Sequence, residues 1–174
     1  MSRIKIVNYR SAYQPFFEAF NRAWIEKHFW LEELDKYVLS HPEEAIINKG
    51  GAILMASYDG QIAGTVALIK VNSQVYEFAK MAVSEDFRRL GIGEALSNAA
   101  IAKANLLGAE KIILYSQTEL EPAILLYKKL GFTEVPLEDG VYKRANIKME
   151  LVLSIRNNGL NGNKDYSDLI NMRH

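Results

Sequence analysis

The chain has 174 residues, of which 49% are apolar and 24% are charged, so we expect one domain with a substantial core. Lys and Arg together number 21, as do Asp and Glu. The resulting net charge of zero argues against a general nucleic-acid or anionic-membrane surface. The sequence has no cysteine, which excludes disulfides, thiolate nucleophiles and cysteine-ligated metals.

Metal and targeting signals are also missing from the sequence. The three histidines, His28, His41 and His174, have no metal-ligand spacing, so we expect no metal. Residues 1–10 alternate charged and apolar side chains, unlike a signal peptide. No apolar run approaches the length of a membrane span. We therefore expect a cytoplasmic protein with no membrane or nucleic-acid partner.

The first fifty residues predict a strand followed by helices. Residues 3–9 alternate apolar and polar side chains, which is typical of a half-buried strand. We expect Ser11 to cap a helix that runs to about His28, with aromatic residues at near-helical spacing. Residues 31–39 predict a second short helix, and a further turn leads to Gly50.

The next hundred residues predict a sheet interrupted by two helices. Three antiparallel strands come first, with a hairpin turn at Asp59-Gly60. A helix closed by Gly108 follows, then a short strand expected to lie parallel to the strand before that helix. The expected strands cover 52–58, 61–71, 75–83, 111–115, 132–137 and 142–153, and the helices cover 91–107 and 121–130.

The element order predicts one domain over residues 1–154, with a mixed α/β (α+β) fold. No internal repeat or domain boundary occurs before Ser154. Residues 155–174 are rich in Asn, Gly, Lys and Asp and predict a polar C-terminal tail. Within it, residues 157–163 read as a flexible linker, and one helical turn or disorder is expected beyond.

Residues 81–96 are the most informative stretch, and they read Met-Ala-Val-Ser-Glu-Asp-Phe-Arg-Arg-Leu-Gly-Ile-Gly-Glu-Ala-Leu. A strand ends here and a helix opens near Gly91, where the first backbone N–H groups have no internal partner and the helix dipole is positive. Gly91 and Gly93 let a ligand approach the backbone closely. Arg88 and Arg89 add donors that suit phosphate oxygens. The stretch predicts a pyrophosphate-binding loop.

Two nucleotide motifs fail on spacing. The dinucleotide fingerprint requires a third glycine where the chain has Leu96, and the Walker loop requires Lys and Ser or Thr where it has Glu94 and Ala95. The remaining pattern, Arg-x-x-Gly-x-Gly after Met-Ala-Val, resembles the loop of the GNAT acetyltransferases, which bind acetyl-CoA. The alternative is a tight turn whose glycines bind nothing.

A second motif supports this resemblance. Residues 123–132 are similar to the family segment Ala-Ile-x-Leu-Tyr-x-x-x-Gly-Phe. The resemblance covers residues 3–153 and implies the GNAT fold, a central, mostly antiparallel mixed sheet of about seven strands flanked by helices. Residues 20–27 and 142–149 resemble a bacterial subgroup whose acetyltransferase part is sometimes fused to a MarR-type winged helix.

The resemblance implies which residues bind acetyl-CoA. In the family the strand before the loop binds the pantetheine arm and the acetyl oxygen; the alternative is an ordinary, fully paired strand. Leu120 stands where many members have Asn, and Gln117 occupies the place of a polar residue used by the subgroup. The implied set is Met81, Ala82, Val83, Arg88, Arg89, Leu90, Gly91, Ile92, Gly93 and Gln117.

Two residues are candidates for the chemistry. Tyr127 matches the family tyrosine, and a phenol pKa of ~10 suits protonation of a departing thiolate; the alternative is a tyrosine that packs the helix against the sheet. With a strand period of two, Glu77 faces the same side as Met81 and Val83. Histone-acetylating members have a glutamate at the matching position, which makes Glu77 a candidate base. The alternative is a structural salt bridge with Lys70 or Arg144.

The acceptor pocket is the least defined part of the site. The resemblance implies walls from the first two helices and from the turn near Tyr142, with Trp24, Phe29, Tyr142 and Arg144 as candidates and His28 and Trp30 beside them. Each is also explained by ordinary packing. The implied activity is acetyl transfer from acetyl-CoA to a primary amine of a small molecule or peptide. The alternative is a non-catalytic acyl-CoA sensor, and the sequence allows a homodimer.

Overall fold

A computed structural model of the chain describes residues 3–140 and 142–153. The predicted tail at 155–174 lies outside the described residues. Seven strands form one sheet in the order β1-β2-β3-β4-β5-β7-β6. Neighbouring strands are antiparallel except β4 and β5, which are parallel. The predicted α+β fold with a mixed, mostly antiparallel sheet is confirmed.

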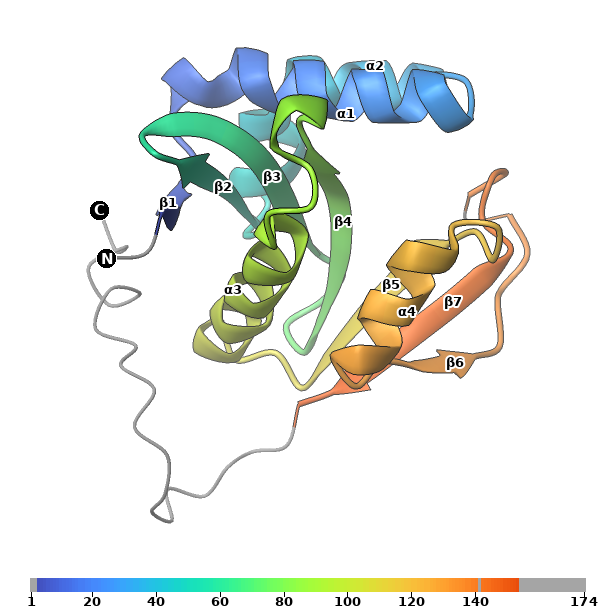
Figure 1. The fold of residues 1–174 in the computed structure, drawn as a ribbon. Coiled ribbons are helices and arrows are strands. Elements are labelled where there is room, and N and C mark those ends of the chain that lie inside the picture. The colour runs from blue at the N-terminus through green and yellow to red at the C-terminus, as the bar shows by residue number, and fades with distance from the viewer. Residues whose placement is uncertain (1–2, 141, 154–174) are drawn as a thin grey trace.

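Figure 1 shows the order of the elements. The strands are β1 Ile4–Asn8, β2 Ala52–Tyr58, β3 Gln61–Lys70, β4 Val75–Val83, β5 Lys111–Ser116, β6 Thr133–Val135 and β7 Ile147–Val152. The helices are α1 Gln14–His28, α2 Glu33–Ser40, α3 Ile92–Leu106 and α4 Glu121–Lys129, with short helical turns at Ser11–Tyr13, Glu43–Ile47 and Glu85–Phe87. Within the described part of the chain, no helix is long and apolar enough to cross a membrane.

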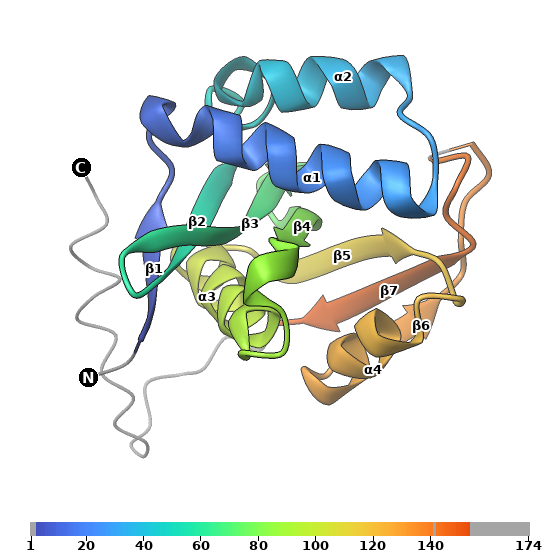
Figure 2. The same ribbon diagram turned by 45° about the horizontal axis from the view of Figure 1, so that its top comes forward.

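Helices cover both faces of the sheet. Figure 2 shows α1 and α2 on one face and α3 and α4 on the other. Successive side chains of β2 point to opposite faces of the sheet. Leu54 packs in the cluster that includes Leu96 of α3, whereas Met55 packs in the cluster that includes Phe17 of α1. Because both faces are covered, the middle of β2 is buried at every position, as in a parallel sheet.

The Asp59-Gly60 hairpin turn is confirmed. Both residues have positive φ, 47° for Asp59 and 83° for Gly60. This combination matches the turn type whose twist suits two adjoining antiparallel strands. The turn sets the register of β2 against β3, in which Tyr58 pairs with Gln61.

The starts of the first two helices differ from the prediction. The Ser11 side chain caps no helix; a 3-10 turn precedes α1, which begins at Gln14 with Pro15 in its first turn. Helix α2 begins at Glu33 because the Asp35 carboxylate accepts a hydrogen bond from the Glu32 backbone N–H at 3.1 Å.

The last two strands are shorter than predicted. Strand β6 ends at Val135 because Pro136 follows, and proline has no N–H to donate to a ladder. Strand β7 begins at Ile147, which pairs with Ser116 at the end of β5. The predicted strand over 142–146 is therefore wrong, since β5 offers no residue for it to pair with.

Gly51, between the turn at Glu43–Ile47 and β2, is packed so closely that it predicts a stability effect. A Cβ at this position would lie 2.3 Å from the Leu68 carbonyl oxygen and 2.9 Å from the Ile46 carbonyl oxygen. Gly51→Ala should lower the free energy of unfolding by about 1–3 kcal/mol, because backbone has to move to admit the methyl group. Thermal unfolding measures this. The control is Gly93→Ala, whose Cβ would meet nothing within 4 Å. Equal midpoints for the two variants would contradict the prediction.

Candidate functional site

Strands β4 and β5 separate in the middle of the sheet. Their parallel ladder joins Val75, Tyr76 and Glu77 to residues 111–113 and then stops. Figure 1 shows the two strands close together at one end and diverging toward α1 and α2. Beyond the ladder, the backbone groups of β4 that point toward β5 have no strand partner, so they are available to a ligand.

A β-bulge in β4 accompanies this separation. Ala79 pairs with Ala67 and Ala82 with Thr65, so two residues of β4 oppose one of β3. The bulged residue Lys80 has a φ of 53°, in the left-handed region. A bulge bends its strand and increases the local twist, which directs the second half of β4 away from β5.

The bulge overturns one prediction about facing. Glu77 pairs with Ile69, which packs against the apolar cluster that includes Phe17 of α1. Met81 and Val83 instead pack against the cluster on the other face of the sheet, which includes Leu96 of α3. Glu77 therefore does not face the same side as Met81 and Val83, because the extra residue reverses the alternation after Ala79. The period of two holds only within an uninterrupted strand.

A cavity of about 120 Å³ occupies the space between the diverging strands. It opens between strands rather than on one face, so residues of both faces line it. Its floor and sides are Glu77, Phe78, Ala79, Lys80, Met81, Leu114, Tyr115, Ser116 and Gln117. The rest of its wall is Asn21, Trp24, Ile25, Phe29, Leu120, Ala123, Tyr127, Tyr142, Arg144 and Ala145.

The predicted phosphate loop lies between β4 and α3. Gly91 is the N-cap residue that precedes α3, with a φ of 83°, and it provides no side chain to cap the first N–H groups. A Cβ on Gly91 or on Gly93 would meet nothing within 4 Å. Arg88, Arg89 and Leu90 are exposed. The helix N-terminus is thus open to an approaching anion.

Of the residues predicted to bind the pantetheine arm, some line the cavity and others do not. Met81 lines the cavity, and its sulfur accepts a hydrogen bond from Ser97 Oγ at 3.4 Å. Ala82 is 2% exposed and pairs with Thr65, and Val83 pairs with Gly64. Gln117 lines the cavity while its side-chain amide donates to the Arg144 carbonyl. Leu120, at the position of the usual family Asn, lines the cavity as well.

Glu77 is a buried carboxylate at the cavity wall. It is 8% exposed and accepts a hydrogen bond of 2.8 Å from the Tyr142 hydroxyl. No ion pair within 4.0 Å includes it among the described residues, so the proposed salt bridge with Lys70 or Arg144 is wrong. Burial raises the pKa of Glu77, while the Tyr142 hydrogen bond and the charge of Lys80 lower it, and the net direction is upward.

Tyr127 of α4 lies at the same cavity, in an aromatic cluster. Its ring centroid is 5.8 Å from that of Phe78 and 6.0 Å from that of Phe132, at edge angles. No side chain of the described residues hydrogen-bonds to its hydroxyl, and none of their fully buried polar side-chain atoms lacks a partner. The hydroxyl therefore reaches the cavity. Burial raises the pKa of Tyr127 to about 12, so the phenol stays protonated.

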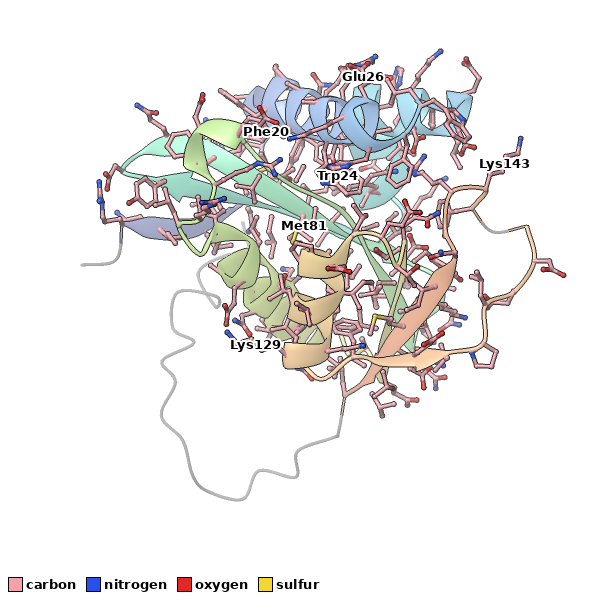
Figure 3. All side chains as sticks on the ribbon, turned by 45° about the vertical axis from the view of Figure 1, so that its right-hand side comes forward. Phe20, Trp24, Glu26, Met81, Lys129 and Lys143 are labelled. Carbon is pink, nitrogen blue, oxygen red and sulfur yellow. The ribbon has the colours of Figure 1, made fainter. Side chains whose placement is uncertain are left out.

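Four predicted acceptor-pocket residues, Trp24, Phe29, Tyr142 and Arg144, line the cavity together. The rings of Trp24 and Phe29 are 5.8 Å apart. Figure 3 shows Trp24 on the side of α1 that faces the sheet and Glu26 on the opposite side. Of the two further candidates, Trp30 is 63% exposed, and His28 packs against Trp24 outside the lining.

Two charged residues at the site, Asp35 and Lys80, are not marked by any pattern in the sequence. Asp35 of α2 is buried and paired with both Arg144 and Lys80. Asp35 lies in a short helix without a sequence motif around it, and its partner Arg144 is 109 positions away. Lys80 was overlooked because nothing in the sequence around it marks a bulge.

Comparison with known proteins identifies the family. Residues 9–132 match the acetyltransferase (GNAT) family. The chain belongs to this family. An acetyltransferase of the GNAT family from Staphylococcus aureus has the same fold, with a TM-score of 0.76, 23% identity, and coverage of 87% of this chain and 99% of that one. A Salmonella typhimurium structure described as containing its cofactor acetyl-CoA gives a TM-score of 0.71 at 18% identity, covering 90% and 97% of the two chains. The predicted GNAT family and fold are confirmed.

Relatives with closer sequences match over part of their length. An N-alpha-acetyltransferase from Sulfurisphaera tokodaii is 36% identical over 100 residues, which cover 48% of this chain and 58% of that protein. An uncharacterized N-acetyltransferase from Bacillus subtilis is 31% identical over 104 residues, which cover 58% of this chain and 67% of that protein. The GNAT chain thus spans less than two thirds of the Sulfurisphaera protein.

Proposed function

We propose that this GNAT chain is an acetyl-CoA-dependent N-acetyltransferase whose acceptor is a primary amine of a small molecule or a peptide. One observation carries the proposal: a single cavity brings together the free edges of β4 and β5, the Tyr127 hydroxyl and the Glu77 carboxylate. Family membership supports acetyl transfer, and the Sulfurisphaera relative, named an N-alpha-acetyltransferase, supports an amine acceptor.

The open N-terminus of α3 fits the pyrophosphate of CoA. The space at Gly91 and Gly93 lets phosphate oxygens approach the backbone N–H groups, and Arg88 and Arg89 are exposed beside them. The free edge of β4 near Met81 would then hold the pantetheine arm and polarise the acetyl carbonyl. The acetyl group arrives as a thioester, the bond that the reaction breaks.

In the proposed mechanism, two side chains take part in the proton transfers. The Glu77 carboxylate accepts a proton from the attacking amine, directly or through water, as the new amide bond forms. The Tyr127 hydroxyl donates to the sulfur as the carbon–sulfur bond breaks and the thiolate leaves. Trp24 and Phe29 supply an apolar wall that orients the acceptor. The resemblance to MarR-fused proteins and a homodimer remain predictions from the sequence.

The direct test is release of free thiol from acetyl-CoA over a panel of primary amines and peptides. Thiol release that depends on the amine, with acetylated product found by mass spectrometry, supports the enzyme. Tight acetyl-CoA binding without turnover on any amine would instead support the non-catalytic acyl-CoA sensor.

The substitution Gly91→Asp tests the cofactor loop. It places a negative charge at the position where the loop is expected to meet phosphate, with no steric obstacle within 4 Å. Affinity for acetyl-CoA should fall about tenfold or more, which corresponds to ~1.4 kcal/mol. Titration calorimetry measures the dissociation constant.

The matched control is Gly91→Asn. Both side chains have to adopt the left-handed φ of 83°, and both do so more readily than other non-glycine residues, so backbone strain is shared and only the charge differs. Equal affinities for the Asp and Asn variants, or an unchanged affinity in a folded Asp variant, would rule out phosphate at this position.

A further inference from the structure

A buried ion cluster lies beside the cavity. Asp35 of α2 is 3% exposed and accepts two hydrogen bonds from the Arg144 guanidinium, Nη1 to Oδ2 at 2.6 Å and Nη2 to Oδ1 at 2.9 Å. Lys80 Nζ donates to Oδ1 at 3.0 Å. We call Asp35, Arg144 and Lys80 the Asp35 cluster. Because forked guanidinium–carboxylate pairs fix both distance and direction, Arg144 is held in one orientation.

The Asp35 carboxylate stays charged over the working pH range. Burial would by itself raise the pKa of Asp35, but the hydrogen bonds and charges of Arg144 and Lys80 outweigh burial and lower it. A depressed carboxyl pKa means that this stabilising contribution is present above about pH 4, the ordinary pKa, and is lost only in stronger acid. At neutral pH Asp35 therefore holds Arg144 as a carboxylate and does not act as a titrating switch.

Arg144 and Tyr142 belong to the same short segment, residues 142–146. Tyr142 donates to Glu77 at 2.8 Å, and Arg144 binds α2 two residues later. Lys143 between them is exposed and points away from the body of the protein, as Figure 3 shows. At the far end of the segment, the Asn146 N–H donates to the Ser116 carbonyl at 2.9 Å. The segment is thus held to β4, α2 and the end of β5.

We propose that Asp35 is a positioning residue: by holding Arg144, it keeps segment 142–146 over the cavity and the Tyr142 hydroxyl on the Glu77 carboxylate. Asp35 is absent from the cavity lining, so it acts through Arg144 and Tyr142. The proposal rests on the proposed function in that Glu77 is taken as the base. It goes further by linking α2, outside the cavity, to the proton-accepting group.

The electrostatic surroundings of Glu77 make the link measurable. The titratable or charged groups that share its cavity are Lys80 of β4, Tyr115 of β5, Tyr127 of α4, and Tyr142 and Arg144 of the segment. The lining residues of α1 are Asn21, Trp24 and Ile25, and Phe29 follows the helix; none of these four side chains titrates. The Tyr142 hydrogen bond lowers the pKa of Glu77 against the effect of burial. Losing that bond should therefore move the acid limb of the rate profile to higher pH.

The test variant is Asp35→Asn, which keeps an oxygen for the Glu32 N–H and removes the charge of the forked pair with Arg144, leaving Arg144 only its longer ion pair with Glu32 among the described residues, at 3.8 Å. Hydrogen–deuterium exchange in segment 142–146 should become at least about tenfold faster as the segment opens locally. The acceptor kcat/KM should fall about tenfold through mispositioning, and its acid limb should move to higher pH. Acetyl-CoA affinity should stay unchanged, because no contact of Asp35 reaches residues 88–93.

Three further variants make the test specific. Glu33→Gln removes an exposed ion pair with Lys36 in the same helix, 2.9 Å long, and should change none of these quantities. Arg144→Gln breaks the cluster from the other side, leaves the hydrogen bond from the Glu32 N–H to Asp35 in place, and should speed exchange in the same segment. In a Tyr142→Phe background, Asp35→Asn should cause no additional shift of the acid limb, since the two residues act in series.

The outcomes separate this proposal from the proposed function. Unchanged exchange in segment 142–146 in both Asp35→Asn and Arg144→Gln would overturn the positioning role, whatever the activity. A lower melting temperature with an unchanged pH profile would also overturn it, by making Asp35 purely structural. Absence of thiol release by the unaltered protein with every amine would instead refute the acetyltransferase, and the exchange result would still decide whether Asp35 holds the segment.

Discussion

Tyr127→Phe should lower turnover by ~10²–10³-fold, the usual loss when a hydrogen-bond donor to developing negative charge is removed, with little change in acetyl-CoA affinity. The substitution keeps the ring and its edge contacts with Phe78 and Phe132, so packing is preserved. Burial raises the pKa of Tyr127 to about 12. Against the ordinary phenol pKa of ~10, this makes full proton transfer to a thiolate about 3 kcal/mol less favourable. We infer that the hydroxyl works chiefly as a hydrogen-bond donor to the departing sulfur.

Single-turnover kinetics, with chemistry as the limiting step, measure this effect. The control is Tyr76→Phe, which removes a hydroxyl from another tyrosine of the same core cluster that does not line the cavity. Its turnover should match that of the unaltered protein. If turnover of Tyr127→Phe stays within about threefold when chemistry is limiting, Tyr127 serves packing and not catalysis.

Glu77→Gln should lower the acceptor kcat/KM by ~10²-fold or more, because the group that accepts the amine proton is lost. The pKa of Glu77 is raised, and the carboxylate, its basic form, predominates above that pKa. The rate of the unaltered protein should therefore rise with pH through the raised pKa. In Glu77→Gln this rise of the rate with pH should disappear. A pH–rate profile measured with the acceptor below saturation tests this.

Thermal stability separates this role from a structural one. A carboxyl whose pKa is raised on folding stabilises the folded state fully below its unfolded pKa, and this contribution is lost as pH rises through the folded pKa. At neutral pH the buried Glu77 charge therefore destabilises the folded state. The Gln side chain removes this charge and keeps an oxygen that accepts the hydrogen bond from the Tyr142 hydroxyl. The melting temperature of Glu77→Gln should be unchanged or higher. A lower melting temperature with an unaltered profile would make Glu77 structural.

The fold could be predicted well because the patterns that indicate its strands, helices and turns lie within short stretches of the sequence. The Asp59-Gly60 turn and the apolar runs on either side indicate two paired strands, and both are present. The turn from β4 to α3 could also be predicted from the sequence, because Gly91 and Gly93 are typical of a turn that leaves the backbone open to a ligand. Strand and helix ends were less accurate where a distant partner decides them, as Ser116 does for the start of β7.

The candidate site could be predicted as a set of residues but not as an arrangement. Glu77 and Tyr142 were both named, for different roles, yet their hydrogen bond joins positions 65 apart. Periodicity placed Glu77 on the face of Met81, and the bulge at Lys80 reversed it. Asp35 was missed because a single carboxylate in a helix reads as solvent-exposed; only the tertiary structure brings two cations to it.

The short ladder between β4 and β5 divides the sheet into two lobes, β1–β4 and β5–β7–β6, which three residue pairs join along a seam. A molecule lying in the divergence touches both lobes at once and acts as a cross-link between them. Part of its binding energy then resists separation of the lobes, so saturation raises the resistance of the whole protein to unfolding. A ligand bound in this divergence would therefore take the place of the missing strand pairing between β4 and β5 and join the two lobes.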